Sequence, residues 1–133
     1  GPFVDVADAK KEVGNIIDNY KTSGTDLTVL LTHIGYKNDK KLAEALDDNW
    51  GVDLIIGAHS HTLLKKPAVV NNVPIVQVGM GTSYVGKFVI EIDVDEHRMV
   101  NYSWELVPIN ENTADDDPVF VPVIVPPLSC AFW

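Results

Sequence analysis

Three histidines stand directly after two apolar runs of the sequence, where their side chains could bind metal ions. His33 follows residues 27–31, and His59 and His61 follow residues 52–56. In an extended segment, residues i and i+2 point the same way, so His59 and His61 are expected to present their imidazoles to one cavity. Imidazole binds zinc, iron, nickel and copper, and two ions about 3.5 to 4 Å apart can hold the attacking and leaving oxygens of a phosphoryl transfer. The pattern predicts a metal or catalytic site.

Other residues with reactive side chains have simpler interpretations. Asp39 either caps the helix after the His33 loop or orients a histidine from behind, and we favour the helix cap. His97 falls in the turn of a predicted hairpin, where a solvated turn residue is the favoured interpretation. Cys130 is the only cysteine, and because no histidine or basic helix end stands near it in the sequence, we expect it to be inert.

A helix between two buried strands is expected to position the histidine loops. Apolar residues at helical spacing predict an amphipathic helix after Asp5 and a second helix over residues 39–48. Residues 27–31 and 52–56 are short apolar runs, typical of buried parallel strands. Strand, helix and strand then form a βαβ unit with a right-handed crossover, and both strands end at one edge of the sheet. Ligands bind at that edge in open α/β sheets.

The second half of the chain predicts strands separated by turns. The candidates are residues 73–78, 85–94 and 99–107, the last two joined by a hairpin turn at 95–98. Apolar side chains alternate with a mixed set along 85–94, so one face of that strand is expected to be apolar. The predicted fold class is α/β, with a βαβ unit followed by antiparallel strands.

The composition, with 133 residues of which 46% are hydrophobic and 22% charged, fits one soluble globular domain. The formal net charge of -9 is a poor match to nucleic acid or to a membrane surface of anionic lipid, so neither is an expected partner. No apolar run reaches the roughly twenty residues that a membrane-spanning helix needs.

Residues 110–118 predict an acidic linker, and residues 119–133 an apolar, proline-rich tail with no assigned role. Because the first residue is Gly1 and not methionine, we expect upstream sequence to be missing.

Five segments carry a resemblance to a known family. They are Leu30–Gly35 followed by Asp39, Asp53–Thr62, Pro74–Gly79, Tyr84–Lys87 and Tyr102–Ile109. These segments resemble the 5'-nucleotidase group of the calcineurin-like metallophosphoesterases, and the similarity covers about residues 3–110. The resemblance implies an αββα sandwich, of which residues 1–109 would form the C-terminal half.

The resemblance also implies a metal-dependent hydrolase that acts on a phosphoester such as a nucleotide. His33 and His59 would then bind one ion and His61 the other, with Asp39 behind these ligands. The complete enzyme would hold two divalent ions, such as zinc or manganese, and this chain by itself at most one. The family's N-terminal motifs D-x-H, G-D-x-x-D and G-N-H-[DE] have no counterpart in their expected context here. We therefore expect the chain alone to be nearly inactive.

The leading hypothesis is a half domain that pairs with a missing N-terminal half or with another copy of the chain. Two alternatives remain open: a non-catalytic module that binds a single metal ion, and an inert α/β scaffold whose histidines are hydrogen-bonded loop residues. The number of bound ions would separate these three hypotheses. Members of the family are mostly exported, so the resemblance implies an extracellular, cell-surface or periplasmic protein.

Overall fold

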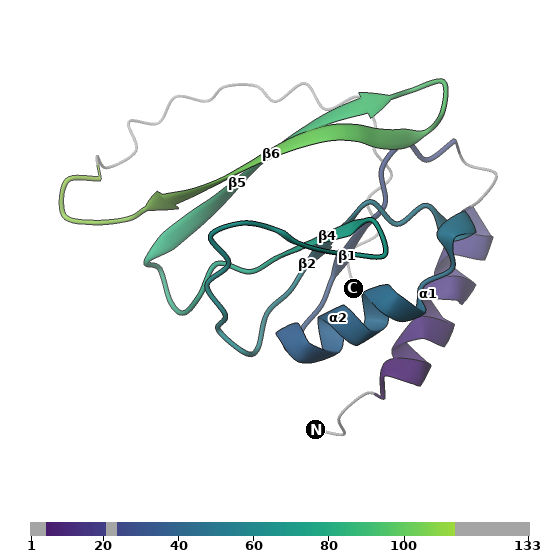
Figure 1. The fold of residues 1–133 in the computed structure, drawn as a ribbon, viewed down its shortest axis with the longest axis horizontal. Coiled ribbons are helices and arrows are strands. Elements are labelled where there is room, and N and C mark those ends of the chain that lie inside the picture. The colour runs from purple at the N-terminus through teal and green to yellow at the C-terminus, as the bar shows by residue number, and fades with distance from the viewer. Residues whose placement is uncertain (1–4, 21–23, 114–133) are drawn as a thin grey trace.

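The computed structural model describes residues 5–20 and 24–113 (Figure 1). The expected linker from residue 114 onward, the expected tail over residues 119–133 and Cys130 lie outside the described residues. In the described part, a long hairpin lies over one face of a four-stranded sheet, and helices pack against the other face. The predicted α/β fold class is therefore confirmed.

The first sheet contains the predicted βαβ unit. Its strands are β1 (Val29–Leu31), β2 (Leu54–Ile56), β4 (Val73–Val76) and β3 (Ala68–Val70), in that order across the sheet. The strands β1, β2 and β4 run parallel, and β3 pairs antiparallel with β4 at the sheet edge. The register pairs Leu31 with Ile56, so β1 and β2 end side by side and deliver the residues that follow them to one edge.

Strand β3 is the one element of this sheet that the hydrophobic patterns do not predict. It turns back into β4 through Asn71 and Asn72, whose φ angles are 50° and 61°. A two-residue hairpin loop favours positive φ at both central residues, and asparagine tolerates that conformation better than most residues. The Asn71–Asn72 pair between two valine-rich segments is therefore the sequence signal for this hairpin.

Helix α2 (Tyr36–Ala45) begins earlier than predicted, and Asp39 is not its cap. The N-cap position belongs to Gly35, which has a φ of 85° and makes no side-chain capping bond. The backbone N–H groups of Asn38 and Asp39 donate to the Gly35 carbonyl oxygen, so Asp39 already lies within the first turn. Glycine adopts positive φ without steric cost, and this allows the chain to turn into the helix directly after the His33 loop. The favoured interpretation of Asp39 as a helix cap is therefore wrong.

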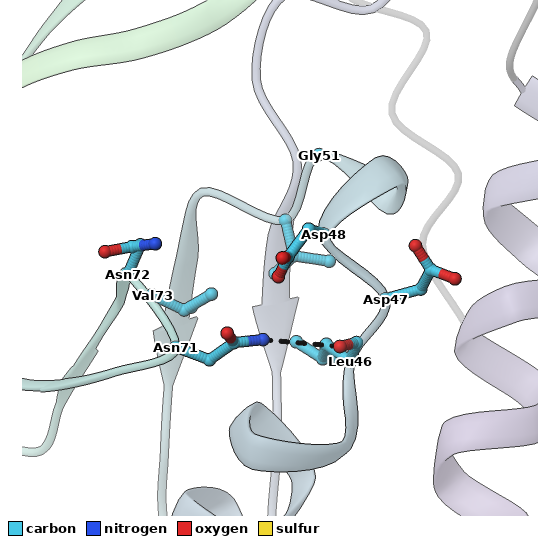
Figure 2. Close-up of a pocket in the computed structure, with 8 residues that line it drawn as sticks. Leu46, Asp47, Asp48, Gly51, Asn71, Asn72 and Val73 are labelled. Carbon is cyan, nitrogen blue, oxygen red and sulfur yellow. Dashed lines mark hydrogen bonds between the residues drawn. The ribbon is translucent and has the colours of Figure 1, made fainter.

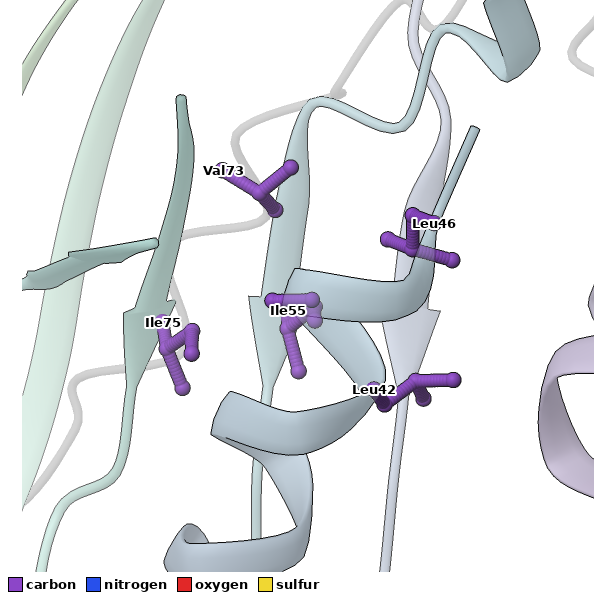
Figure 3. Close-up of a cluster of buried hydrophobic side chains, with 6 residues drawn as sticks. Leu42, Leu46, Ile55, Val73 and Ile75 are labelled. Atoms are coloured by element: carbon purple, nitrogen blue, oxygen red, sulfur yellow. The ribbon is translucent and has the colours of Figure 1, made fainter. Parts of the chain in front are cut away.

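The hydrophobic core lies between α2 and the first sheet. Its buried members are Leu42, Ala43, Leu46, Ile55, Val73 and Ile75, most of which are labelled in Figure 3. Helix α1 (Val6–Tyr20) and the short helix η1 (Asp48–Trp50) pack at its border. Gly14 of α1 lets the two helices approach, because a Cβ atom there would lie 2.7 Å from the Trp50 ring. Among the described residues, no helix has the length and apolar character needed to cross a membrane.

The second sheet is the predicted antiparallel hairpin, formed by β5 (Tyr84–Asp93) and β6 (Arg98–Pro108). Inward and outward side chains alternate along β5 as far as a β-bulge between Glu91 and Ile92. The bulge shifts the pairing by one residue and leaves Ile92 exposed, although the alternation predicts it on the apolar face. Residues 94–97 form the turn, so the placement of His97 in a hairpin turn is confirmed.

Aromatic side chains of the hairpin face the first sheet. Phe88 stacks on Tyr102 with ring centroids 4.9 Å apart, and Gly86 leaves room for the Trp104 ring, which a Cβ atom would approach to 2.3 Å. The Trp104 Nε1–H donates to the Leu64 carbonyl oxygen at 3.1 Å and ties the hairpin to the segment after β2. The Trp104 hydrogen bond therefore holds the second sheet near the segment that follows β2.

Candidate functional site

The histidine loops lie at the edge where the sequence predicts them. His33 follows Thr32 after β1, and His59 and His61 follow β2. The Thr32 N–H donates to the Ile56 carbonyl oxygen at 3.0 Å, which extends the strand pairing into the start of the His33 loop. All three histidines are exposed, so their rings are available to a ligand.

The structure brings together two of the three histidines. The rings of His33 and His59 meet edge to face, with centroids 5.2 Å apart and planes at 66°. Among residues 5–20 and 24–113, however, no group of three or more histidine, cysteine, aspartate or glutamate side chains is close enough to hold a metal ion. His61 therefore does not join His33 and His59 in a three-ligand cluster.

The loop over residues 57–62 is not the extended segment that the spacing predicts. His59 and His61 have φ angles of 73° and 52°, both in the left-handed region. In that conformation the rule that residues i and i+2 point the same way no longer holds, so the argument that both imidazoles face one cavity is wrong. A left-handed conformation costs a residue other than glycine about 1 to 2 kcal/mol, and it persists only where the surroundings stabilise it.

A buried amide stabilises this loop, and the sequence patterns do not single it out. Gln77 follows β4 and is only 3% exposed. Its Oε1 accepts hydrogen bonds from Ser60 Oγ at 2.9 Å and from the Thr62 N–H, and its Nε2 donates to the Ala58 carbonyl oxygen at 3.0 Å. The available signal was a single amide within the apolar run 73–78, because a buried polar side chain needs hydrogen-bond partners.

Asp39 lies beneath both histidine loops and is completely buried. Its Oδ1 accepts a hydrogen bond from Thr32 Oγ1 at 2.6 Å, while Oδ2 has no hydrogen-bond partner. Oδ2 faces Gly57, where a Cβ atom would lie 2.3 Å from it. Burial raises the pKa of Asp39 above its ordinary value of 3.8, and the hydrogen bond from Thr32 partly offsets that rise.

Two cavities of the described residues lie away from the histidine pair. A cavity of about 220 Å³ lies at the opposite end of the sheet, near the starts of β2 and β4 (Figure 2). Its lining residues are Leu46, Asp47, Asp48, Gly51, Val52, Asn71, Asn72 and Val73. A second cavity of about 110 Å³ lies between the two sheets and is bordered by Gly57, Gln77 and Trp104 among others. Only the second cavity touches the base of a histidine loop.

The chain is similar in sequence to proteins that are named as a nucleotide phosphoesterase, an apyrase and a 5'-nucleotidase. The chain is 39% identical over 93 residues to the trifunctional nucleotide phosphoesterase protein YfkN of Bacillus subtilis, covering 66% of this chain and 6% of YfkN. It is 32% identical over 130 residues to an apyrase of Aedes aegypti, covering 80% and 22% of the two chains. It is 23% identical over 137 residues to a snake venom 5'-nucleotidase of Crotalus adamanteus, covering 90% and 23%. A comparison with protein-family models finds no match.

A solved structure shares the fold. The sulfate thiohydrolase SoxB of Thermus thermophilus, in complex with glycerol, matches with a TM-score of 0.67 at 24% identity, over 74% of this chain and 17% of SoxB. The chain thus spans between 6% and 23% of the length of these four proteins. With the βαβ unit, the stacked hairpin and the paired histidine loops in place, these similarities show that the chain belongs to the 5'-nucleotidase-like metallophosphoesterase superfamily.

Proposed function

We propose that this chain supplies part of the metal centre of a phosphoester hydrolase of 5'-nucleotidase type. The observation that carries the proposal is the contact between the His33 and His59 rings at the carboxyl edge of two parallel strands. Ligand sites of open α/β sheets are found at this edge. The nucleotide phosphoesterase, apyrase and 5'-nucleotidase names of its relatives support a nucleotide as the phosphoester.

The donor set of the described residues fits only part of such a centre. Neutral imidazole nitrogen is a suitable ligand for zinc and related ions. His33 and His59 offer two such ligands side by side, but no third ligand completes the group among the described residues. A catalytic zinc site commonly uses three protein ligands, and a two-ion site needs more. We therefore propose that the chain alone hydrolyses nothing at a useful rate and binds at most one ion.

We propose the following roles for this chain's residues in the complete protein. His33 and His59 would bind one divalent ion, such as zinc or manganese, and His61 would reach a second ion completed by residues from outside the chain. The bound ions would supply Lewis-acid polarisation of the phosphoryl group and make a water molecule more acidic. Asp39 would support the two loops from below through its contacts with Thr32 and Gly57.

The proposed partner is the N-terminal half of the same catalytic domain. Leu31 at the end of the edge strand β1 is 74% exposed, and the neighbouring Ile56 is 41% exposed. An edge strand with uncovered apolar side chains is suited to pair with a further strand. A second copy of the chain is the alternative occupant, and sedimentation of the chain alone would reveal it as a dimer.

Metal content and hydrolysis together test the proposal. The chain is freed of metal with a chelator and dialysed against zinc or manganese, and its bound ions are counted by mass spectrometry, alone and with the N-terminal half of the complete protein. Hydrolysis of p-nitrophenyl phosphate and of nucleoside monophosphates is measured on the same samples. We expect two ions and activity only in the assembled form. His33→Ala or His59→Ala should lower the activity, and the affinity for the ion that these two histidines bind, at least tenfold.

His97→Ala is the matched control, because it removes the same side chain from the turn of the distant hairpin. One ion without activity in the assembled form would favour the single-ion binding module. No ion in either form would leave an inert scaffold and overturn the proposal.

We further propose that the complete protein works outside the cytoplasm. The support is the venom origin of one relative. Fractionation of the producing cells, with an antibody against this chain, should place the protein in the periplasm, at the cell surface or in the medium. Recovery only with cytoplasmic markers would contradict it.

A further inference from the structure

Gln77 lies at the end of β4, where its side chain reaches the His59–His61 loop from Ala58 to Thr62. The strand β4 ends beside β2, with Val76 paired to Ile56, and the Gly57 N–H donates to the Val76 carbonyl oxygen at 2.9 Å. The residue after β4 therefore stands next to the start of the loop that follows β2. Gln77 is buried there, although its side chain is polar.

The three hydrogen bonds of Gln77 enclose both histidines of the loop. Ala58, which receives the Nε2 hydrogen bond, directly precedes His59. Thr62, which donates its N–H to Oε1, directly follows His61, and Ser60 between the histidines donates its hydroxyl to the same oxygen. A carboxamide can accept hydrogen bonds at its oxygen and donate them from its nitrogen at the same time.

The network continues to the other histidine loop. Ser60 Oγ accepts a hydrogen bond from the Tyr36 N–H at 3.0 Å, at the first residue of α2. Tyr36 follows His33 by one short turn through Gly35, so Gln77, Ser60 and Tyr36 connect the two loops in series. A shift of Gln77 would therefore change the position of the His59–His61 loop relative to His33.

The backbone of the loop requires such support. His59 and His61 both have left-handed φ angles, which are unfavourable for residues with a Cβ atom. Removing the amide would take away the hydrogen bond of the Thr62 N–H and one hydrogen bond each from the Ala58 carbonyl oxygen and the Ser60 hydroxyl. Strained conformations at functional sites persist where the surrounding contacts determine them.

We propose that Gln77 is a positioning residue, which sets the direction of the His59 and His61 imidazoles relative to His33. This inference deepens the proposed function and rests on it, since direction matters only if the imidazoles bind an ion. Gln77 touches neither imidazole through its hydrogen bonds and acts through Ala58, Ser60 and Thr62.

The test compares three single variants of the full chain. Gln77→Met keeps the length of the side chain and removes its three hydrogen bonds. Ser60→Ala leaves the Gln77 amide in place and removes the hydroxyl that bonds to Gln77, to the Tyr36 N–H and to Thr62 Oγ1. Val73→Ala is the control: it shortens a buried side chain at the other end of the same strand β4, away from the loop (Figure 3).

Two readouts are independent of catalysis. The first is the set of imidazole nitrogen resonances of His59 and His61 in metal-free, ¹⁵N-labelled protein, with His97 as the internal reference. The second is the hydrogen-exchange rate of the Thr62 amide. Each variant is measured at the same interval below its own melting temperature, so that loss of global stability is matched.

We expect Gln77→Met to shift the His59 and His61 resonances and to speed hydrogen exchange of the Thr62 amide at least tenfold. Ser60→Ala should produce smaller changes in both readouts, and Val73→Ala should leave both unchanged. Zinc affinity, measured by chelator competition, should fall by about tenfold in Gln77→Met, as is typical when a group that orients a ligand is lost. If Gln77→Met does not fold, Ser60→Ala alone must show the resonance shifts. Changes no larger than those in Val73→Ala would overturn the positioning role.

A different result would contradict the proposed function without deciding the role of Gln77. Wild-type chain that binds no zinc, alone or with the N-terminal half, would contradict the metal centre, while the resonances and the Thr62 exchange would still decide whether Gln77 positions the loop. Altered resonances with unchanged zinc affinity would overturn the positioning role and leave the metal centre intact.

Discussion

The imidazole rings of His33 and His59 meet edge to face at a centroid distance of 5.2 Å, although 26 positions separate them in the sequence. Their contact follows from the parallel register of β1 and β2, which end together at Leu31 and Ile56. His61, only two positions from His59, does not complete a three-ligand group with them. The direction of each side chain therefore depends on the loop conformation more than on sequence spacing.

Substitution Asp39→Asn should change how stability depends on pH. The folded-state pKa of Asp39 lies above its ordinary value of 3.8 because the carboxyl is buried, so the folded state binds this proton more tightly than the unfolded state does. Binding of this proton therefore contributes to the stability of the folded state below pH 3.8, and the contribution is lost as the pH rises through the folded-state pKa. Relative to wild type, Asp39→Asn should therefore gain stability between pH 4 and neutrality.

Urea unfolding across this pH range, with a chelator present, measures the effect. The expected gain near neutrality is about 1 to 3 kcal/mol, the cost of one buried polar group without a partner. A difference that stays constant from pH 3 to pH 7 would show that Asp39 does not titrate as its burial indicates.

Substitution Gly57→Ala should disturb the base of the histidine loop. The new Cβ atom would lie 2.3 Å from Asp39 Oδ2 and 3.1 Å from Gln77 Nε2, so one of these buried groups must move. Overpacking of this kind costs about 1 to 3 kcal/mol of stability, and zinc affinity should fall with it. Gly24→Ala is the control for metal binding, because its Cβ atom would meet nothing within 4 Å. Any loss of stability in this control comes from the strain of alanine at a φ of 67° and not from a contact with the histidine loop. The loss of stability caused by Gly57→Ala should be smaller in an Asp39→Ala background. An equal loss there would exclude a clash between the new Cβ atom and Asp39.

Substitution His97→Ala should have little effect on stability or on metal binding. His97 Nδ1 lies 2.5 Å from Asp26 Oδ1, but the two side chains are 52% and 43% exposed. Solvent screens such pairs, and they contribute less than about 1 kcal/mol. Chemical unfolding and zinc titration should both match wild type, whereas a tenfold loss of zinc affinity would place His97 in the metal centre.

Substitution Leu31→Asp should impair assembly without impairing the chain itself. Leu31 is 74% exposed on the edge strand β1, so the free energy of unfolding of the isolated chain should change by less than about 0.5 kcal/mol. Affinity for the N-terminal half, measured by titration calorimetry, should fall at least tenfold. Val69→Asp is the matched control on the opposite edge strand β3, where the replaced side chain is 56% exposed. Equal effects of the two variants would show that assembly does not use the β1 edge.

The sequence by itself determined the elements that carry the site. Short apolar runs ending at Leu31 and Ile56, with an amphipathic helix between them, specify a βαβ unit because each run must be buried and parallel strands need a crossover. The same pattern places His33 and His59 at one sheet edge. The alternation along β5 likewise predicts its buried face as far as Ile90, because side chains of a strand alternate between its two faces.

Only the tertiary structure decided how the site residues are held. Asp39 looks like a helix cap in the sequence, but the conformational freedom of Gly35 starts α2 earlier and places the carboxyl under both loops. Gln77 looks like one polar residue in an apolar strand, yet its amide meets a loop that begins some twenty positions earlier. The left-handed backbone at His59 and His61 depends on those distant hydrogen bonds. Local patterns encode burial and periodicity, whereas the direction of a loop side chain depends on partners that only folding brings together.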